Sequence, residues 1–286
     1  AALRTCGMQC MSFSLEQASK CWAACRASET LPTFARMAGR HFGMDNNAAG
    51  LRLPRVDTER VKHANAWRQP KYPDAFVEAI REKRLTAPQP RPQTSPYFDT
   101  SANHTIDFHA VCALKFTPPA MQGYTMDTYP NAAAAQAAGA VVTHQGNCGA
   151  CSTLQDLAVY VSRPDLTTPV RRCAFRSFVS NDWSRSCLMD LGFSEPCANV
   201  WLYNAENTRL RCVYICLLLV RSKNNLENGR LNSCLQCDED MSGPFFKKYS
   251  ARTRRNSGLH SAIVRPGPSI VPLEHHYPGV PEPLRG

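Results

Sequence analysis

The sequence has no long run of apolar residues. The longest, VYICLLLV at Val213–Val220, is eight residues, whereas a helix needs about 20 mostly apolar residues to cross a bilayer. We therefore expect no membrane span. The start of the chain, AALRTC, also lacks a basic segment followed by an apolar one. The expectation is a mature secreted chain whose signal peptide has been removed.

Two other patterns are missing. No repeat of about 20–50 residues occurs, which argues against a solenoid. The CxxC pairs have no regular spacing to one another or to histidines, as the ligands of structural zinc would. Hydrophobic residues make up 43% of the 286 residues, so the composition is that of a globular protein with a sizeable core.

Cysteine, by contrast, is abundant. The fourteen cysteines are an even number, which favours a disulfide framework in a secreted or lumenal, oxidising compartment. The sequon NHT at Asn103 fits such a glycoprotein. We assign to disulfides Cys6, Cys10, Cys21, Cys25, Cys173, Cys187, Cys197, Cys212, Cys216, Cys234 and Cys237.

The charge is basic. Thirty-three basic and 23 acidic residues leave a net charge of +10, and much of the excess lies in KKYSARTRR at 247–255. This surface could bind an acidic glycan or another polyanion, whereas nucleic acid is not expected in that compartment. The residues concerned are Lys247, Lys248, Arg252, Arg254 and Arg255. The alternative is a solvated basic loop.

Residues 1–100 are predicted to form a separate region. Two CxxxC units near its start place their cysteines one helical turn apart, which predicts a helical hairpin held by disulfides. A segment rich in Pro and Arg follows, in which only 73–84 has helical periodicity. TAPQPRPQTSP at 86–96 reads as an extended linker.

Residues 101–286 are predicted to form the main core. Apolar and polar residues alternate over 105–116, as in a half-buried strand. A short helix at 131–139, a strand at 140–144 and a helix at 152–161 follow, with Ser152 as N-cap. The pattern is β–α–β–α, and the fold class is α+β, or small α/β, with a small central sheet.

The remaining chain is helical and rich in cysteine. Ser194 and Pro196 open a long predicted helix at 197–220, where Cys212 and Cys216 share one face. Cys187, Cys234 and Cys237 are possible partners from the flanking segments. The last forty residues are expected to form an extended tail packed on the body.

The segment HQGNCGACSTLQDLAVYV at 144–161 raises the question of chemistry. Cys151 immediately precedes a predicted helix, whose N-terminus favours a thiolate. QGNCGAC resembles the active-site segment of papain-like cysteine peptidases over these seven residues. The resemblance implies that Gln145 donates to an oxyanion, that Cys148 is disulfide-bonded and that Cys151 is the nucleophile. This chain has Ser152 where that family has an aromatic residue.

A thiol nucleophile needs a base within reach. His144 is nearest in sequence. His109 shares a strand face with Asp107, which could orient it, but a parallel pairing of the two predicted strands would leave it over 20 Å from the CGAC loop at about 3.3 Å per residue. Only an antiparallel pairing brings it close. His260 is the third candidate.

Three other interpretations remain open. A CGAC at a helix start also fits a thioredoxin-like dithiol. His104, His109, His144 and Asp107 could be considered as metal ligands, although the spacing of the first two is unsuitable, and we predict neither a metal nor a cofactor. In the last interpretation, Cys148 and Cys151 each pair elsewhere and serve as scaffold.

The leading hypothesis is a secreted, cysteine-dependent hydrolase or acyl-transfer enzyme acting on a small-molecule or peptide substrate. The competing hypothesis is a non-catalytic extracellular binding or structural protein with a basic C-terminal surface. An enzyme of this kind needs a free Cys151.

Overall fold

A computed structural model describes residues 67–92, 94–98, 109–219, 222–227, 229–264 and 270–284. The chain divides into two compact units, Ala1–Pro54 and Arg55–Gly286, and every described residue belongs to the second. The predicted disulfide cysteines Cys6, Cys10, Cys21 and Cys25, the sequon Asn103 and the candidate orienting residue Asp107 lie outside the described residues.

The described part of the chain contains both helices and strands, which confirms the predicted α+β class. In chain order they are α5 (Asp74–Glu82), β1 (Arg84–Leu85), η2 (Pro96–Phe98), β2 (Val111–Phe116), β3 (Gly123–Tyr129), α6 (Ala132–Ala137), β4 (Val141–Gln145), α7 (Leu154–Ser162), α8 (Thr167–Arg176), α9 (Asn181–Asp190), α10 (Glu195–Leu218), α11 (Ser233–Met241), α12 (Gly243–Ser250) and η3 (Arg255–Ser257).

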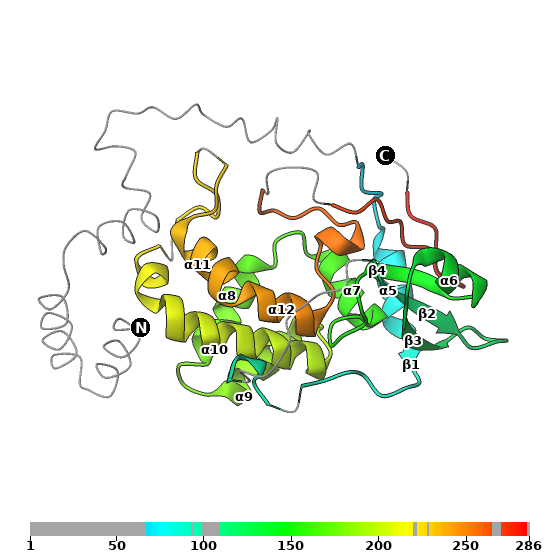
Figure 1. The fold of residues 1–286 in the computed structure, drawn as a ribbon, viewed down its shortest axis with the longest axis horizontal. Helices are drawn as coiled ribbons and strands as arrows, with labels where there is room; N and C mark the ends of the chain where they lie inside the picture. Colours follow the sequence, from blue (N-terminus) through cyan, green and yellow to red (C-terminus); the bar gives the residue numbers. More distant parts are fainter. Residues whose placement is uncertain are drawn as a thin grey trace, which may run out of the picture. The chain divides into compact units, whose positions relative to one another are not determined.

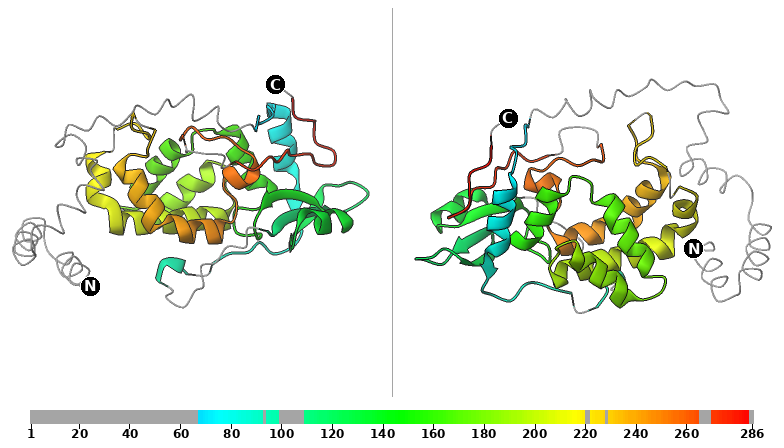
Figure 2. Two further views of the ribbon diagram at one scale, coloured as in Figure 1. Left: turned by 45° about the horizontal axis from the view of Figure 1, so that its top comes forward. Right: turned by 180° about the vertical axis from the view of Figure 1, so that it is seen from behind.

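The sheet has four strands in the order β1–β3–β2–β4. β2 is antiparallel to both of its neighbours, and β1 is parallel to β3. Figure 1 shows the sheet with α5, α6 and α7 around it, and α8 to α12 gathered on the other side of α7. Figure 2 shows the same separation from two further directions.

The predicted half-buried strand is buried more completely than expected. On one face, Cys112 and Leu114 join the main core with residues of α5 and α7. On the other face, Val111 and Ala113 pack against α6 through Ala135. The alternating pattern identifies β2 correctly, but α6 covers the face that the sequence assigned to solvent, where Lys115 alone within the strand is exposed.

Local capping fixes the helix starts. The Asn131 side chain accepts from the Ala134 N–H at 2.9 Å and opens α6, and Ser194 caps α10 as predicted. For α7 the predicted cap was wrong by one residue: Thr153, not Ser152, accepts from the Asp156 N–H. The Ser152 hydroxyl instead forms a hydrogen bond with His144 Nε2.

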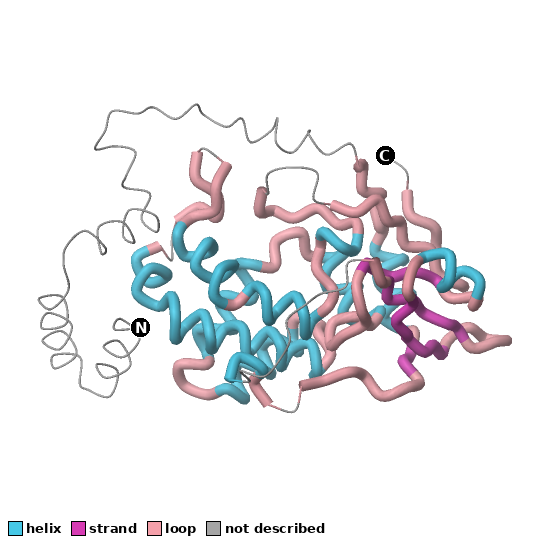
Figure 3. The backbone as a smooth tube through the Cα atoms, in the orientation of Figure 1, coloured by secondary structure: helices cyan, strands magenta, loops and turns pink. Residues whose placement is uncertain are grey.

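Five disulfides hold the helices and the sheet together, and no cysteine of the described ranges is free. They are Cys112–Cys148, Cys151–Cys197, Cys173–Cys187, Cys212–Cys237 and Cys216–Cys234. The last two join α10 to α11, as the shared helix face of Cys212 and Cys216 predicts. The tail, coloured as loop in Figure 3, runs along the body and buries His275 and Tyr277.

No helix within the ranges that the structure covers combines the length and the apolar character needed to span a membrane.

Candidate functional site

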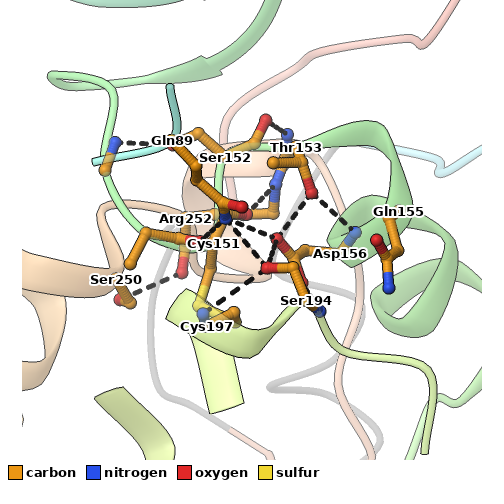
Figure 4. The surroundings of a disulfide bond; sticks show 12 residues. Gln89, Cys151, Ser152, Thr153, Gln155, Asp156, Ser194, Cys197, Ser250 and Arg252 are labelled. Atoms are coloured by element: carbon orange, nitrogen blue, oxygen red, sulfur yellow. Dashed lines mark hydrogen bonds between the residues drawn. A yellow bond between two sulfur atoms is a disulfide. The ribbon is translucent and has the colours of Figure 1, made fainter. Parts of the chain in front are cut away.

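The CGAC loop lies between β4 and α7 and is fastened at both of its cysteines. Cys148 is bonded to Cys112 on β2, and Cys151 is bonded to Cys197 on α10 (Figure 4). Cys151 and Cys197 have no exposed surface. The loop therefore joins the sheet to the long helix.

These bonds contradict the prediction that Cys151 is a nucleophile. A thiolate is the reactive form of cysteine, and the Cys151 sulfur is instead bonded to Cys197. The dithiol interpretation also fails, because Cys148 and Cys151 have different partners. The sequence correctly places Cys151 just before a helix. It contains no signal that Cys197, 46 residues away, forms a disulfide with Cys151.

The polar groups around this disulfide form a closed hydrogen-bond network. Asp156 accepts from the Thr153 hydroxyl at 2.6 Å, from the Ser194 N–H at 2.8 Å and from the Ser194 hydroxyl at 2.9 Å. Gln89 donates to the Ser194 oxygen at 2.8 Å. Burial raises the pKa of Asp156 to about 6, against the opposing effect of these donors. Asp156 thus fixes the starts of α7 and α10 together.

Arg252 is fully buried beside the same loop, which contradicts its assignment to a polyanion-binding surface. Its Nε donates to the Cys151 carbonyl at 2.9 Å, Nη1 to the Thr143 carbonyl and the Ser257 hydroxyl, and Nη2 to the Thr143 hydroxyl and the Ser152 carbonyl. All five N–H groups of the guanidinium are used. Burial lowers the pKa of Arg252.

A ring of hydrogen bonds continues from Arg252 to the C-terminal tail. Thr143, which accepts from Arg252, lies 3.0 Å from the Tyr277 hydroxyl. Tyr277 lies 2.9 Å from His275 Nδ1, and His275 Nε2 lies 2.9 Å from the Ser257 carbonyl. Since that carbonyl can only accept, Nε2 carries the proton and Nδ1 accepts from Tyr277. Burial, aided by the charge of Arg252, lowers the pKa of His275 to about 3.

His144, a predicted base, is fully buried. Its Nδ1 donates to the Gln145 carbonyl at 2.9 Å, and its Nε2 accepts from the Ser152 hydroxyl at 2.7 Å. Ser152 in turn accepts from the Gly149 N–H at 2.8 Å. Burial and then Arg252 lower the pKa of His144 well below its ordinary value. The imidazole is a neutral, structural group, and the Gln145 side chain is exposed.

The other two histidine candidates are exposed, whereas His144 is buried. β2 and β4 pair antiparallel, with Cys112 opposite His144, so His109 lies at the end of β2 nearer the CGAC loop, where it is exposed. His260 is exposed as well, and its Nε2 lies 3.3 Å from the Trp67 carbonyl. Across the described ranges, no three His, Cys, Asp or Glu side chains gather as a metal site.

The other members of the predicted basic surface are largely engaged within the protein. Lys247 forms a 3.0 Å ion pair with Glu239. Arg254 donates to the carbonyls of Tyr160 and His260, at 2.8 and 3.2 Å. Lys248 lies 5.5 Å above the Tyr249 ring. Arg255 is half-buried at the start of η3. Binding of a polyanion here stays a prediction.

A feature that the sequence did not indicate is a cavity of about 320 Å³ among the helices. It is bounded by α8, α10, α11 and α12, by the end of α7 and by the segment 253–263. Its lining is mostly apolar and includes Leu166, Val170, Ala174, Trp201, Val213 and Phe246. A cavity of this size lies at the lower end of the ~300–1,000 Å³ range of small-molecule sites.

Tyr160 and Trp201 line this cavity, and each has an enclosed polar atom without a hydrogen-bond partner, the Tyr160 hydroxyl and the Trp201 Nε1. Burial raises the pKa of Tyr160, and Trp201 opposes this rise. Their geometry is nevertheless not that of a hydrogen bond. Aromatic residues on amphipathic helices read as ordinary core in the sequence, so these residues carried no signal of a site.

The fold and its bonds define a disulfide-rich α+β protein of the kind found in extracellular and other oxidising environments. Residues 181–273 match the model of a family of unknown function (DUF8771). The match is shorter than half of the chain and extends from α9 past η3, so it includes Arg252 and both disulfides between α10 and α11. No curated protein and no solved structure matches the chain.

Proposed function

We propose that this is a non-catalytic extracellular binding protein that holds a small, largely apolar molecule in the cavity between α8, α10 and α12. The observation that carries the proposal is the cavity itself, whose lining is mostly apolar. A mostly apolar pocket with a few convergent polar groups is the usual form of a small-molecule site.

The cysteine chemistry supports binding over catalysis. The Cys151 sulfur is committed to Cys197, and the neighbouring His144 is neutral and enclosed. Neither group lines the cavity. The residues that suggested an enzyme thus have a structural role in fixing the loop between β4 and α7.

The rim of the cavity gives a ligand access. Phe175, Phe178 and Leu217 line the cavity, yet their exposed fractions are 41%, 55% and 54%. Large apolar side chains that are both part of a cavity and open to water form a mouth through which an apolar molecule can enter. Burial of such a molecule would also shield these three side chains.

The test uses the oxidised full chain and N-phenyl-1-naphthylamine, an uncharged probe that fluoresces in apolar surroundings. We expect saturable binding that Ala174→Trp weakens at least about tenfold, because the indole fills the space beside Val170. Ala132→Trp, at an exposed position of α6, is the matched control.

If Ala174→Trp lowers the thermal midpoint strongly, Ala205→Leu narrows the same cavity from α10. Probe binding that neither lining variant changes would overturn the proposal. So would the absence of saturable binding by the native chain.

A further inference from the structure

We propose that this protein binds the surface of membranes that contain anionic lipids, through an exposed apolar face formed by α8, the turn after it and the second half of α10. The large apolar side chains of this face are all exposed to water. They are Phe175, Phe178, Val179, Leu210, Tyr214, Leu217 and Leu218. The inference goes beyond the proposed binding function, because it concerns the outside of the protein.

The two parts of the apolar face adjoin each other. The rings of Phe175 and Phe178 are stacked, with centroids 6.2 Å apart. The Arg209 guanidinium lies 5.2 Å from the centre of the Phe178 ring, and its Nη1 donates to the Ser177 carbonyl at 2.8 Å. The turn after α8 therefore lies against α10 next to Leu210.

The α10 part of the face continues the side of the helix on which α9 packs. α9 begins at Asn181, whose side chain donates to Glu206 at 2.5 Å. Leu210, Tyr214 and Leu217 follow Glu206 at spacings of four, four and three residues, so they share its side of α10. α9 thus covers this side only as far as Glu206, and the apolar stripe beyond it is exposed.

The side chains of the face project far from the surface. Val179 and Leu218 are each 73% exposed. A protein partner would need a matching pocket for each projecting side chain, whereas the fluid interior of a bilayer takes up such side chains without one. Tyr214 adds an aromatic ring with a polar end, and tyrosine is enriched where bilayers meet water.

The charge around the face is complementary to anionic headgroups. α8 has three arginines and no acidic residue, and residues 207–218 of α10 have two arginines and again no acidic residue. The exposed ones are Arg172, Arg176 and Arg211. Of the two acids nearest in sequence, Asp182 is paired with Arg185 at 2.7 Å and Glu206 accepts from α9.

This combination favours a membrane over a second copy of the chain. Like charges around the face would repel another copy, whereas each arginine near an anionic bilayer is attracted to it. Apolar and aromatic side chains beside basic ones are the usual composition of surfaces that bind at the membrane interface.

The face also contains the mouth of the cavity, since Phe175, Phe178 and Leu217 belong to both. An apolar molecule dissolved in the bilayer would therefore reach the cavity without crossing water. This consequence rests on the proposed function, whereas membrane binding itself does not.

The test is co-sedimentation of the oxidised full chain with sucrose-loaded vesicles. One set contains phosphatidylcholine alone, and the other contains equal parts of phosphatidylcholine and phosphatidylglycerol. Val179→Asp and Leu218→Asp each place a negative charge in the face, and neither position lines the cavity. Leu284→Asp makes the same change at a leucine of the tail that is 57% exposed, and it is the matched control. Arg176→Gln removes one positive charge.

We expect the native chain to bind the mixed vesicles at least about tenfold more tightly than phosphatidylcholine, and less tightly as salt is added. Val179→Asp and Leu218→Asp should each weaken binding about tenfold or more, because an apolar side chain is no longer buried and the new charge is repelled. Arg176→Gln should weaken it about fivefold. Leu284→Asp should leave the affinity unchanged.

Three results would overturn the inference. The native chain could fail to bind the mixed vesicles, or Leu284→Asp could weaken binding as much as the two changes within the face. The third is a dimer in sedimentation equilibrium that Leu218→Asp dissociates, without vesicle binding, which would assign the face to a second copy.

Binding of N-phenyl-1-naphthylamine in the absence of vesicles separates this inference from the proposed function. A native chain that binds the probe but not the mixed vesicles would overturn the membrane inference alone. A native chain that binds the mixed vesicles in the expected way but not the probe would support the membrane inference and overturn the proposed function.

Discussion

The Arg252 Nε–H donates to the Cys151 carbonyl at 2.9 Å and so joins residues 101 positions apart. The same guanidinium bonds β4 and the segment after α12, so one buried side chain holds three parts of the fold in register. The loop predicted to carry a nucleophile is held through its backbone by this arginine and through the Cys151 sulfur by α10.

Arg252 should be essential for stability. Arg252→Lys keeps the charge but offers three donors in place of five and a shorter reach. Because buried acceptors would lose their partners, we expect a loss of about 3 kcal/mol in the free energy of unfolding, measured by urea denaturation of the oxidised chain. Arg172→Lys, at an exposed position of α8, is the control. An equal and small effect of both changes would contradict this role.

The Cys151–Cys197 bond should act as a structural cross-link. Its partners are 46 residues apart, against 14 for Cys173 and Cys187. From loop entropy alone, replacing both cysteines of a pair with Ala should cost about 4 kcal/mol for the longer loop and about 3 kcal/mol for the shorter. Unfolding curves of the two double variants would show the difference.

Alkylation of the native chain followed by mass spectrometry provides the direct check on the same bond. We expect no modification of Cys151 without prior reduction. Rapid modification of Cys151 in the native protein would restore the nucleophile hypothesis and contradict its pairing with Cys197.

Buried His275 should make the protein sensitive to acid. Its pKa is about 3 when folded and about 6.5 when unfolded, so the unfolded state takes up a proton first as the pH falls. The stability contributed by neutral His275 is therefore present above pH 6.5 and is lost progressively towards pH 3. At pH 4 the loss should be on the order of 3 kcal/mol. His275→Gln should flatten this part of the stability profile. An unchanged slope would show that other groups cause the acid sensitivity.

The contribution of Asp156 to the stability of the fold should depend on pH in the opposite direction. Its pKa is about 6 when folded, against 3.8 for the free side chain, so the folded state keeps its proton to a higher pH. Its contribution should fall by about 3 kcal/mol in all, of which about 2 kcal/mol is lost between pH 4 and pH 6. Asp156→Asn removes this titration. The difference in unfolding free energy between native protein and variant, measured at pH 4 and pH 7, should therefore change in favour of the variant at the higher pH. A difference independent of pH would contradict the raised pKa.

Local sequence signals located much of the secondary structure. The Asn131 cap, the alternation in β2 and the Ser194 cap each act within a few residues, so the helices and strand that they predict appear where expected. β3 was not identified. Its buried positions, Tyr124 and Met126, form too short an alternation to stand out, and the strand is defined by pairing with β2.

The candidate site was predicted far less well, because its properties depend on distant contacts. The sequence placed Cys151 correctly at the start of a helix, but its partner comes from α10. Arg252 lies in a charged run that resembles a solvated surface, yet it donates to five acceptors, four of which come from β4 and the loop before α7. Tyr160 and Trp201 belong to different helices, and their shared cavity arises only when α7 and α10 pack.

By itself, the sequence determined the α+β class, the disulfide-rich character, several caps and the shared face of Cys212 and Cys216, because these follow from composition and from contacts within one or two helical turns. Only the tertiary structure decided that Cys151 is a cross-link, that Arg252 is buried and that the helices enclose a cavity. Each of these features depends on contacts between residues that are far apart in the sequence. Such contacts are determined by long-range packing and not by local periodicity.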